Sequence, residues 1–194
     1  CIFFTIFFFY CCRWYKMVTI LNVAEKPSVA QEIAHILAKN PTPFVRTTRT
    51  HLRNLQTHSC IVCAQNLFGV KCWRFPLQID PVPTPSNMLF TSVAGHITDL
   101  VFVGKVVGIR APLVEPLELQ ISPHSQPFIQ TLAQLSMQAQ WLVLWTDCDR
   151  EGEAIARDIR DVCTKRNPTL AVKRAHFSSL TAGDIHHALQ SLTQ

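Results

Sequence analysis

One segment of this 194-residue chain restricts its possible folds more than any other, because a continuous apolar run leads directly into a cluster of acidic residues. The run is Trp141-Leu-Val-Leu-Trp145, a pattern typical of a strand buried on both faces of a parallel sheet. The acidic segment follows as Thr146-Asp-Cys-Asp-Arg-Glu-Gly-Glu153, in which Gly152 permits a sharp turn into a helix. Since open parallel sheets bind ligands beyond the carboxyl ends of their strands, this loop is the first place to expect chemistry.

Strand and helix patterns alternate along most of the chain, which favours an α/β domain with right-handed crossovers. Strands are expected at 18–23, 89–93, 117–121, 141–145 and 171–176. Helices are expected from Pro27 to the Asn40-Pro41 step, over 127–139, from Gly152 to the Asn167-Pro168 step, and after a capping box at Thr181–Asp184. The sequence therefore predicts a mainly parallel sheet flanked by helices.

Two stretches do not fit this alternation. Residues 1–16 are mostly apolar, but they lack the basic segment and the cleavage site of a signal peptide. We interpret them as a non-native or disordered leader, with a membrane-touching tail as the alternative. Residues 41–88 show no sustained period, so we expect an irregular insertion there. One domain is then expected over residues 17–194.

Composition excludes several classes of protein. With 48% hydrophobic and 16% charged residues, the chain can bury a core and is not a disordered tail. No stretch reaches the roughly 20 apolar residues of a membrane-spanning helix. The formal net charge of +5 is weak evidence for any partner.

The eight cysteines favour free thiols in a reducing, intracellular compartment. Cys60-Ile-Val-Cys63, with Cys72 and His58 nearby, is the only zinc-like spacing, and it is weak because structural zinc needs four ligands. Cys148 and Cys163 are expected to be buried, at a strand edge and on a helix face, as small hydrophobic side chains.

The acidic segment itself predicts a metal site. Asp147, Asp149 and Glu151 are spaced two apart, so an extended backbone would put their carboxylates on one side. Crowded carboxylates repel one another by several kcal/mol, and a divalent cation relieves that repulsion. Hard oxygen ligands suit Mg²⁺ better than zinc. The alternative is that these acids only cap the following helix and interact with its dipole.

A second pair of candidate residues lies at the end of the first strand, which we expect at the same edge of the sheet. Glu25 could exchange protons there, and Lys26 could hold a phosphate as a point charge. Further phosphate contacts are offered by Arg150 and by a basic cluster of Lys165, Arg166, Lys173 and Arg174, although we favour a solvated turn as the interpretation of that cluster. His96 is either a phosphate ligand or a polar loop residue. Trp141 and Trp145 are expected in the core.

Three separated motifs together resemble a known family. Asn22-Val-Ala-Glu-Lys-Pro-Ser28, Thr91-Ser-Val-Ala-Gly-His96 and the segment Leu144–Glu153 resemble the N-terminal Toprim domain of type IA DNA topoisomerases, in particular the eukaryotic topoisomerase III branch. The resemblance covers residues 18–40 and 89–192. It implies a Rossmann-like Toprim fold and an ATP-independent isomerase that cuts, passes and religates single-stranded DNA through a 5′-phosphotyrosine link.

The resemblance also implies roles for individual residues. Asp147, Asp149 and Glu151 would hold Mg²⁺. Glu25 would handle the proton of the leaving 3′-oxygen, and Lys26 would steady the scissile phosphate. Contacts with the DNA are expected from Lys26, Arg150 and His96. A nuclear location is implied, as are a RecQ-type helicase and an OB-fold accessory protein as possible partners of the full-length enzyme.

The nucleophilic tyrosine of this family lies in a separate downstream domain, and Tyr10 and Tyr15 match no such motif. We therefore expect the chain to be a fragment with half an active site, inactive alone. Two rival hypotheses remain open: a stand-alone Toprim nuclease or primase-like enzyme, and a non-catalytic nucleic-acid-binding fragment. A dinucleotide-binding protein is a poor third, because no GxGxxG follows the first strand.

Overall fold

The structure is a computed structural model that describes residues 17–39, 65–79, 86–102 and 117–194. Its strands are β1 (Thr19–Ala24), β2 (Gln65–Leu67), β3 (Val70–Leu77), β4 (Ser86–Ser92), β5 (Thr98–Phe102), β6 (Leu117–Ile121), β7 (Trp141–Trp145) and β8 (Ala171–Arg174). Its helices are α2 (Pro27–Lys39), the 3₁₀ turn η4 (Pro123–Ser125), α3 (Gln126–Ser136), α4 (Arg150–Arg166) and α5 (Ala182–Gln190). Within these ranges, no helix combines the length and the apolar character that crossing a membrane requires.

The centre of the fold is a six-stranded sheet in the order β2-β3-β4-β1-β7-β8. Strands β4, β1, β7 and β8 run parallel to one another. At one side of the sheet, β3 pairs antiparallel with β4, and β2 pairs antiparallel with β3. The prediction of an α/β fold with a mainly parallel sheet is therefore confirmed.

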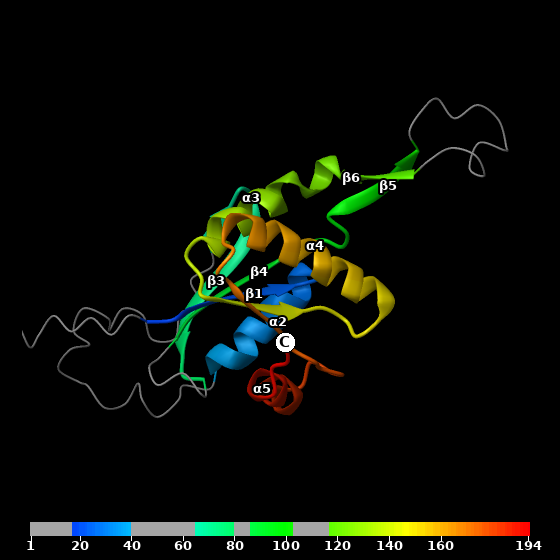
Figure 1. Cartoon of the computed structure of the whole chain (residues 1–194). Coiled ribbons are helices and arrows are strands. Elements are labelled where there is room, and N and C mark those ends of the chain that lie inside the picture. Colours follow the sequence, from blue (N-terminus) through cyan, green and yellow to red (C-terminus); the bar gives the residue numbers. More distant parts are fainter. Residues whose placement is uncertain (1–16, 40–64, 80–85, 103–116) are drawn as a thin grey trace, which may run out of the picture.

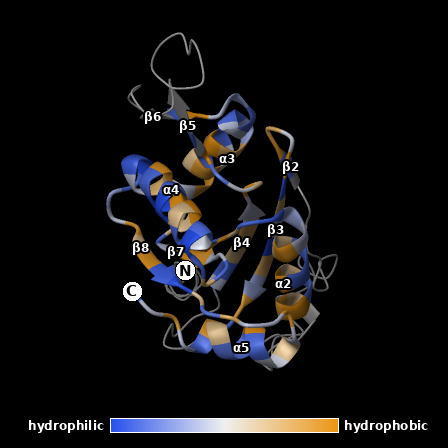
Figure 2. Cartoon of the chain, turned by 90° about the vertical axis from the view of Figure 1, so that its right-hand side faces the viewer, coloured by the Kyte–Doolittle hydropathy of each residue, from blue (hydrophilic) through white to orange (hydrophobic). Residues whose placement is uncertain are grey.

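Helices cover both faces of this sheet, with α3 and α4 on one side and α2 and α5 on the other (Figure 1). Alternate residues of the central strands enter the two separate cores. In β7, Val143 and Trp145 pack on the side of α2 and α5, whereas Leu142 and Leu144 pack on the side of α3 and α4. The helices carry apolar and polar residues on different faces (Figure 2). This double burial explains why the central strands are continuous apolar runs.

The expectation that residues 41–88 form only an irregular insertion is wrong for the part that the structure describes. A hairpin, β2 and β3, extends the sheet there, and β4 begins at Ser86. The alternation of β3 is interrupted because Cys72 and Trp73 are both buried, so no simple period marks the strand. Pro76 is tolerated because β2 pairs only with residues 70–72 and leaves this part of β3 at an edge. Residues 1–16 and 40–64, with the predictions made for them, lie outside the described residues.

Strand β5 is the other element that the sequence did not predict. It pairs with β6 in a separate two-stranded sheet, which extends away from the central sheet in Figure 1. The hairpin is tied to α4, since the backbone N and the hydroxyl of Thr98 donate to Asp158 Oδ2 at 3.2 and 2.8 Å. The remaining predicted elements are present with bounds shifted by a few residues. In particular, α4 begins at Arg150, two residues before Gly152.

Candidate functional site

The carboxyl ends of β1, β4 and β7 meet at one rim of the sheet, and backbone hydrogen bonds hold their loops together. Glu25 N donates to the carbonyl of Trp145 at 3.3 Å, and Gly95 N donates to the carbonyl of Glu25 at 3.4 Å. Val93 N donates to the carbonyl of Ala24 at 3.0 Å. The loop after β1 therefore lies between the loop after β4 and the acidic loop after β7, as the parallel pairing requires.

Lys26 links two of these loops electrostatically. Its Nζ lies 3.2 Å from Glu25 Oε1 and 3.9 Å from Asp147 Oδ2. The hydrogen bond to Glu25 raises the pKa of Lys26 most, and the negative charges of Glu25, Asp147 and, more weakly, Glu151 raise it further. Glu25 is buried, with 8% of its surface exposed, whereas the Lys26 side chain is 57% exposed. The rim thus stabilises a positive charge that solvent and ligands can reach.

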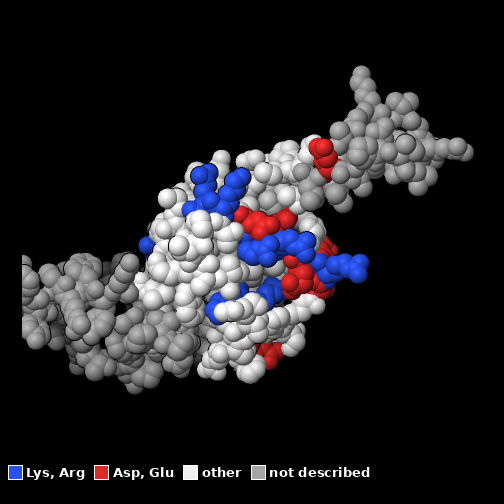
Figure 3. All heavy atoms as spheres, in the orientation of Figure 1, with Lys and Arg blue, Asp and Glu red and all other residues white. Residues whose placement is uncertain are grey.

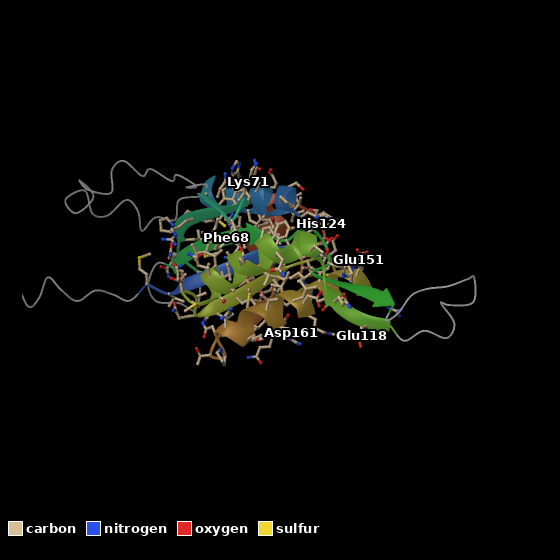
Figure 4. The ribbon with its side chains drawn as sticks, turned by 90° about the horizontal axis from the view of Figure 1, so that it is seen from above. Phe68, Lys71, Glu118, His124, Glu151 and Asp161 are labelled. Carbon is tan, nitrogen blue, oxygen red and sulfur yellow. The ribbon has the colours of Figure 1, made fainter. Side chains whose placement is uncertain are left out.

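The acidic loop turns into α4 rather than continuing as extended chain. Asp149 is the N-cap of α4, and its Oδ1 accepts a hydrogen bond from Gly152 N at 2.6 Å. Glu151 already belongs to the first helical turn, and its Oε1 lies 3.4 Å from His96 Nε2. The prediction that an extended backbone aligns the three carboxylates is therefore wrong, because the helix begins earlier than expected. Figure 4 shows Glu151 on the surface, at the end of the molecule where β5 and β6 project.

Gly152 makes this turn possible by its lack of a side chain. A Cβ atom at this position would lie 2.1 Å from the backbone oxygen of Asp147, a distance that real structures do not allow. Among the described glycines, a positive φ occurs at Gly69 and Gly95 but not at Gly152, so close approach is the reason for glycine here and not backbone freedom. The hydroxyl of Thr146 donates to the carbonyl of Gly152 at 2.9 Å and fixes the loop against the helix.

Arg174, at the end of β8, is a structural part of the site that sequence reasoning missed. Its guanidinium donates to Thr146 Oγ1, to the carbonyl of Asp147 at 3.0 Å and to Glu153 Oε1 at 2.7 Å. Only 7% of Arg174 is exposed, so its interpretation as part of a solvated turn is wrong. The sequence could have revealed this role of Arg174 by its position at the end of the strand beside β7. From there a long cationic side chain can reach the acidic loop.

The remaining predicted site residues are on the same rim. Arg150 is exposed in the first turn of α4, and its side chain forms no ion pair or hydrogen bond with any residue that the structure describes. His96 is exposed and lies against Glu151. Trp145 is fully buried, as expected, and its indole Nε1 donates to Asn22 Oδ1 at 3.0 Å. This hydrogen bond satisfies the buried side-chain oxygen of Asn22 beneath the rim.

The fit of the rim to Mg²⁺ can be judged from its donor atoms. Asp147, Asp149 and Glu151 present exposed carboxylate oxygens, the donor type that Mg²⁺ prefers. Glu25 raises the pKa of Lys26 most, and Asp147 and Glu151 raise it further, so two of these three carboxylates also stabilise positive charge. Among the residues with described positions, however, no three His, Cys, Asp or Glu side chains converge closely enough to hold a metal ion. The three carboxylates therefore fit Mg²⁺ in donor type and in charge, although their side chains do not converge on one point.

The described cysteines divide into two kinds. Cys72 and Cys163 are buried, and burial raises the pKa of the Cys163 thiol to about 12. Cys148 is exposed, contrary to the expectation of a buried strand edge, because it belongs to the acidic loop. Its Sγ lies 3.4 Å from His176 Nδ1. Residues 58–63, which carry the weak zinc-like spacing, are outside the described ranges.

Comparisons with known proteins give matches of three kinds. A family model described as "Toprim domain" matches residues 20–180. The Arabidopsis thaliana "DNA topoisomerase 3-alpha" is 36% identical over 182 residues, covering 90% of this chain and 17% of the relative. The Drosophila melanogaster "DNA topoisomerase 3-alpha" is 30% identical over 192 residues, covering 95% of this chain and 14% of the relative. A solved structure of full-length topoisomerase I from Thermotoga maritima has a TM-score of 0.43 and 22% identity, covering 87% of this chain and 20% of that chain. The chain therefore spans less than a fifth of the length of these two curated relatives.

Proposed function

The chain belongs to the Toprim domain family, and from this premise we propose that it forms the Toprim part of a type IA DNA topoisomerase of the eukaryotic topoisomerase III branch. Its substrate in this proposal is single-stranded DNA, which the whole enzyme cuts, passes and religates through a 5′-phosphotyrosine link. The match to relatives named DNA topoisomerase 3 supports the branch. The arrangement of the rim supports the part that this chain plays.

The single observation that carries the proposal is the position of Lys26 between Glu25 and Asp147. Lys26 is exposed enough to bind a DNA phosphate, and its ammonium is a strong point charge for that purpose. The carboxyl group of Glu25 lies next to that ammonium. In its acid form it is placed to give a proton to the leaving 3′-oxygen, and as the carboxylate it is placed to take that proton back during religation. We assign Glu25 and Lys26 to catalysis on this basis.

Asp147, Asp149 and Glu151 are the residues that would hold Mg²⁺ at this rim. Bound there, the metal would supply positive charge that offsets the charge of the phosphate and aligns the cut ends. Arg174 and Gly152 fix the backbone of Asp147, and the Asp149 cap fixes the first turn of α4. These contacts hold the carboxylates in place before any ligand binds. Arg150 and His96 are proposed to contact DNA phosphates on either side of the cut.

The described residues contain no tyrosine, and the two tyrosines of the chain, Tyr10 and Tyr15, lie outside them. The 194-residue polypeptide is therefore expected neither to relax supercoiled DNA nor to form a covalent DNA adduct by itself. Detection of either activity in pure material would refute this expectation. Metal-dependent nicking by the chain alone, lost in Asp147→Asn, would instead support a stand-alone Toprim nuclease.

The proposed function is tested in a chimera. Residues 17–194 replace the matching region of the Arabidopsis relative, and relaxation of negatively supercoiled plasmid is measured with Mg²⁺. We expect relaxation by the chimera, and its loss when Glu25→Gln or Asp147→Asn is introduced. Asp161→Asn is the control, since Asp161 lies on the exposed side of α4 and pairs with Arg160. Equal activity of Asp147→Asn and Asp161→Asn would contradict the proposal.

Further features of the whole enzyme follow only from the relatives. Because these are eukaryotic proteins named DNA topoisomerase 3, we propose action in the nucleus, in DNA recombination. A RecQ-type helicase and an OB-fold accessory protein are proposed partners of the full-length enzyme. Co-purification of the tagged, full-length protein from nuclear extract is the direct test of these partners.

A further inference from the structure

A cleft of about 420 Å³ lies between α4 and β8, beside the last residues of the chain. Its floor is apolar and consists of Leu144, Ala156 and Val172. Cationic side chains line its walls, among them Arg157 and Arg160 from α4. Figure 3 shows basic side chains over α4 on this face, next to acidic ones. The cleft is large enough for one nucleotide-sized group and too small for a duplex.

The positive charge of this cleft is only partly balanced by the protein. The Arg157 side chain forms no hydrogen bond or ion pair with any residue that the structure describes. Arg160 pairs with Asp161 at 2.8 Å. Glu153 has the one acidic side chain among the described lining residues, and Arg174 neutralises it at 2.7 Å. The cleft therefore offers two exposed guanidinium groups, of which that of Arg157 has no partner in the described structure, and an anionic ligand complements them.

The cleft also adjoins the acidic loop. His176 lines the cleft, and its Nδ1 lies 3.4 Å from the Sγ of Cys148, which stands between Asp147 and Asp149 in the chain. Arg174 lines the cleft as well, and it donates to the carbonyl of Asp147. Two residues that line the cleft, His176 and Arg174, thus contact the acidic loop directly. A chain of phosphates that enters the rim can continue into the cleft.

We propose that the cleft between α4 and β8 binds backbone phosphates of the single-stranded DNA whose cleaved linkage lies at Lys26. The proposal rests on the proposed function and extends it, since it assigns the path of the strand beside the site. Arg157 and Arg160 bind phosphate oxygens, and the apolar floor contacts a sugar or a base. A positive groove that follows the backbone is the usual way in which proteins hold single strands without reading their sequence.

The test measures binding of the 194-residue chain to a fluorescein-labelled single-stranded oligonucleotide by anisotropy, between about 50 and 200 mM salt. The double variant Arg157→Gln/Arg160→Gln removes two charges from the cleft. The matched control, Lys71→Gln/Arg74→Gln, removes two charges from β3, which is separated from β8 by three strands of the sheet. Circular dichroism and melting establish that each variant is folded, and Arg157→Gln alone and Arg157→Lys serve as milder variants.

We expect the cleft variant to bind about tenfold more weakly than the wild type, and the slope of log K against log salt to fall by about 1.4, since each phosphate contact on a single strand contributes about 0.7. In the control variant, the affinity and the salt slope each change by less than half as much as in the cleft variant. Arg157→Lys retains most of the binding. Equal losses in the two double variants overturn the proposal, as does a wild-type chain that does not bind. Displacement of the oligonucleotide by millimolar inorganic phosphate, with the salt slope of the cleft variant unchanged, shows a small-anion site only and also overturns it.

The two proposals can fail separately. If the cleft variant binds like the wild type while the chimera relaxes plasmid, the path of the strand is wrong and the proposed function stands. If the cleft variant loses binding while the chimera fails to relax plasmid, the cleft binds a nucleic-acid strand and the proposed function is wrong.

Discussion

Replacement of Gly152 by alanine tests the packing of the acidic loop against α4. The added Cβ would lie 2.1 Å from the oxygen, 2.9 Å from the carbon and 3.0 Å from the nitrogen of the Asp147 backbone. All three contacts are with main-chain atoms, so no side chain can rotate away. The backbone of Asp147 must retreat by about 1 Å to reach an allowed contact. Overpacking of this kind typically costs about 1–3 kcal/mol, and we expect a value near 3 kcal/mol because only backbone can move.

Gly183→Ala is the matched control for this substitution. Gly183 also lies in the first turn of a helix, α5, but its Cβ would have nothing within 4 Å. Alanine is the better helix former, so this variant should be more stable than the wild type by about 0.5 kcal/mol. The two substitutions are chemically identical and are expected to have opposite signs.

The assay is urea unfolding followed by tryptophan fluorescence, which reports the buried Trp145 next to the loop. Gly152→Ala should lower the midpoint without changing the slope, and Gly183→Ala should raise it slightly. The displaced Asp147 should also weaken any ligand that the rim holds, because an error of about 1 Å in such a site can cost 10²-fold. If Gly152→Ala is as stable as Gly183→Ala, the close approach described here is wrong.

Three further predictions follow from single residues. Thr181→Ala should destabilise the chain by about 1 kcal/mol in urea unfolding, because Thr181 Oγ1 caps α5 by accepting from Asp184 N; an unchanged midpoint would contradict that role. Arg174→Lys should lower the stability by about 2 kcal/mol in the same assay, because an ammonium cannot replace the three hydrogen bonds of the buried guanidinium. A stability within about 0.5 kcal/mol of the wild type, the effect of an ordinary surface substitution, would contradict this role of Arg174. In native alkylation at about pH 8, peptide mapping should find Cys148 modified and Cys163 protected. Because burial raises the pKa of Cys163 to about 12, only about 10⁻⁴ of it is thiolate at that pH, and equal labelling would show that the core opens.

The parts of the fold that the sequence predicts are those in which local chemistry and burial agree. β7 is an apolar run because both of its faces meet helices, and α2 ends at Lys39 because the next residue precedes a proline. β3 was not predictable in the same way. Its neighbouring residues Cys72 and Trp73 are both buried, which breaks the period that identifies a strand.

The residues of the candidate site also differ in whether their positions could be predicted from the sequence. Glu25 and Asp147 could be brought together from sequence, because the carboxyl ends of adjacent parallel strands share one edge of the sheet. The role of Asp149 as a cap depends on where α4 begins, which a glycine in the first turn obscures. The burial of Arg174 arises from contacts with residues more than 20 positions away, so no local pattern reveals it.

The central claim is that the rim formed by Glu25, Lys26 and the acidic loop seats a cation beside a nucleic-acid backbone. Isothermal titration of the 194-residue chain with Mg²⁺ tests this most directly, with Asp147→Asn compared with Asp161→Asn, a substitution of the same type on the exposed face of α4. We predict that the wild type and Asp161→Asn bind Mg²⁺ with the same affinity and that Asp147→Asn binds about tenfold or more weakly, as expected for loss of a carboxylate ligand. Equal binding by Asp147→Asn and Asp161→Asn would contradict the claim.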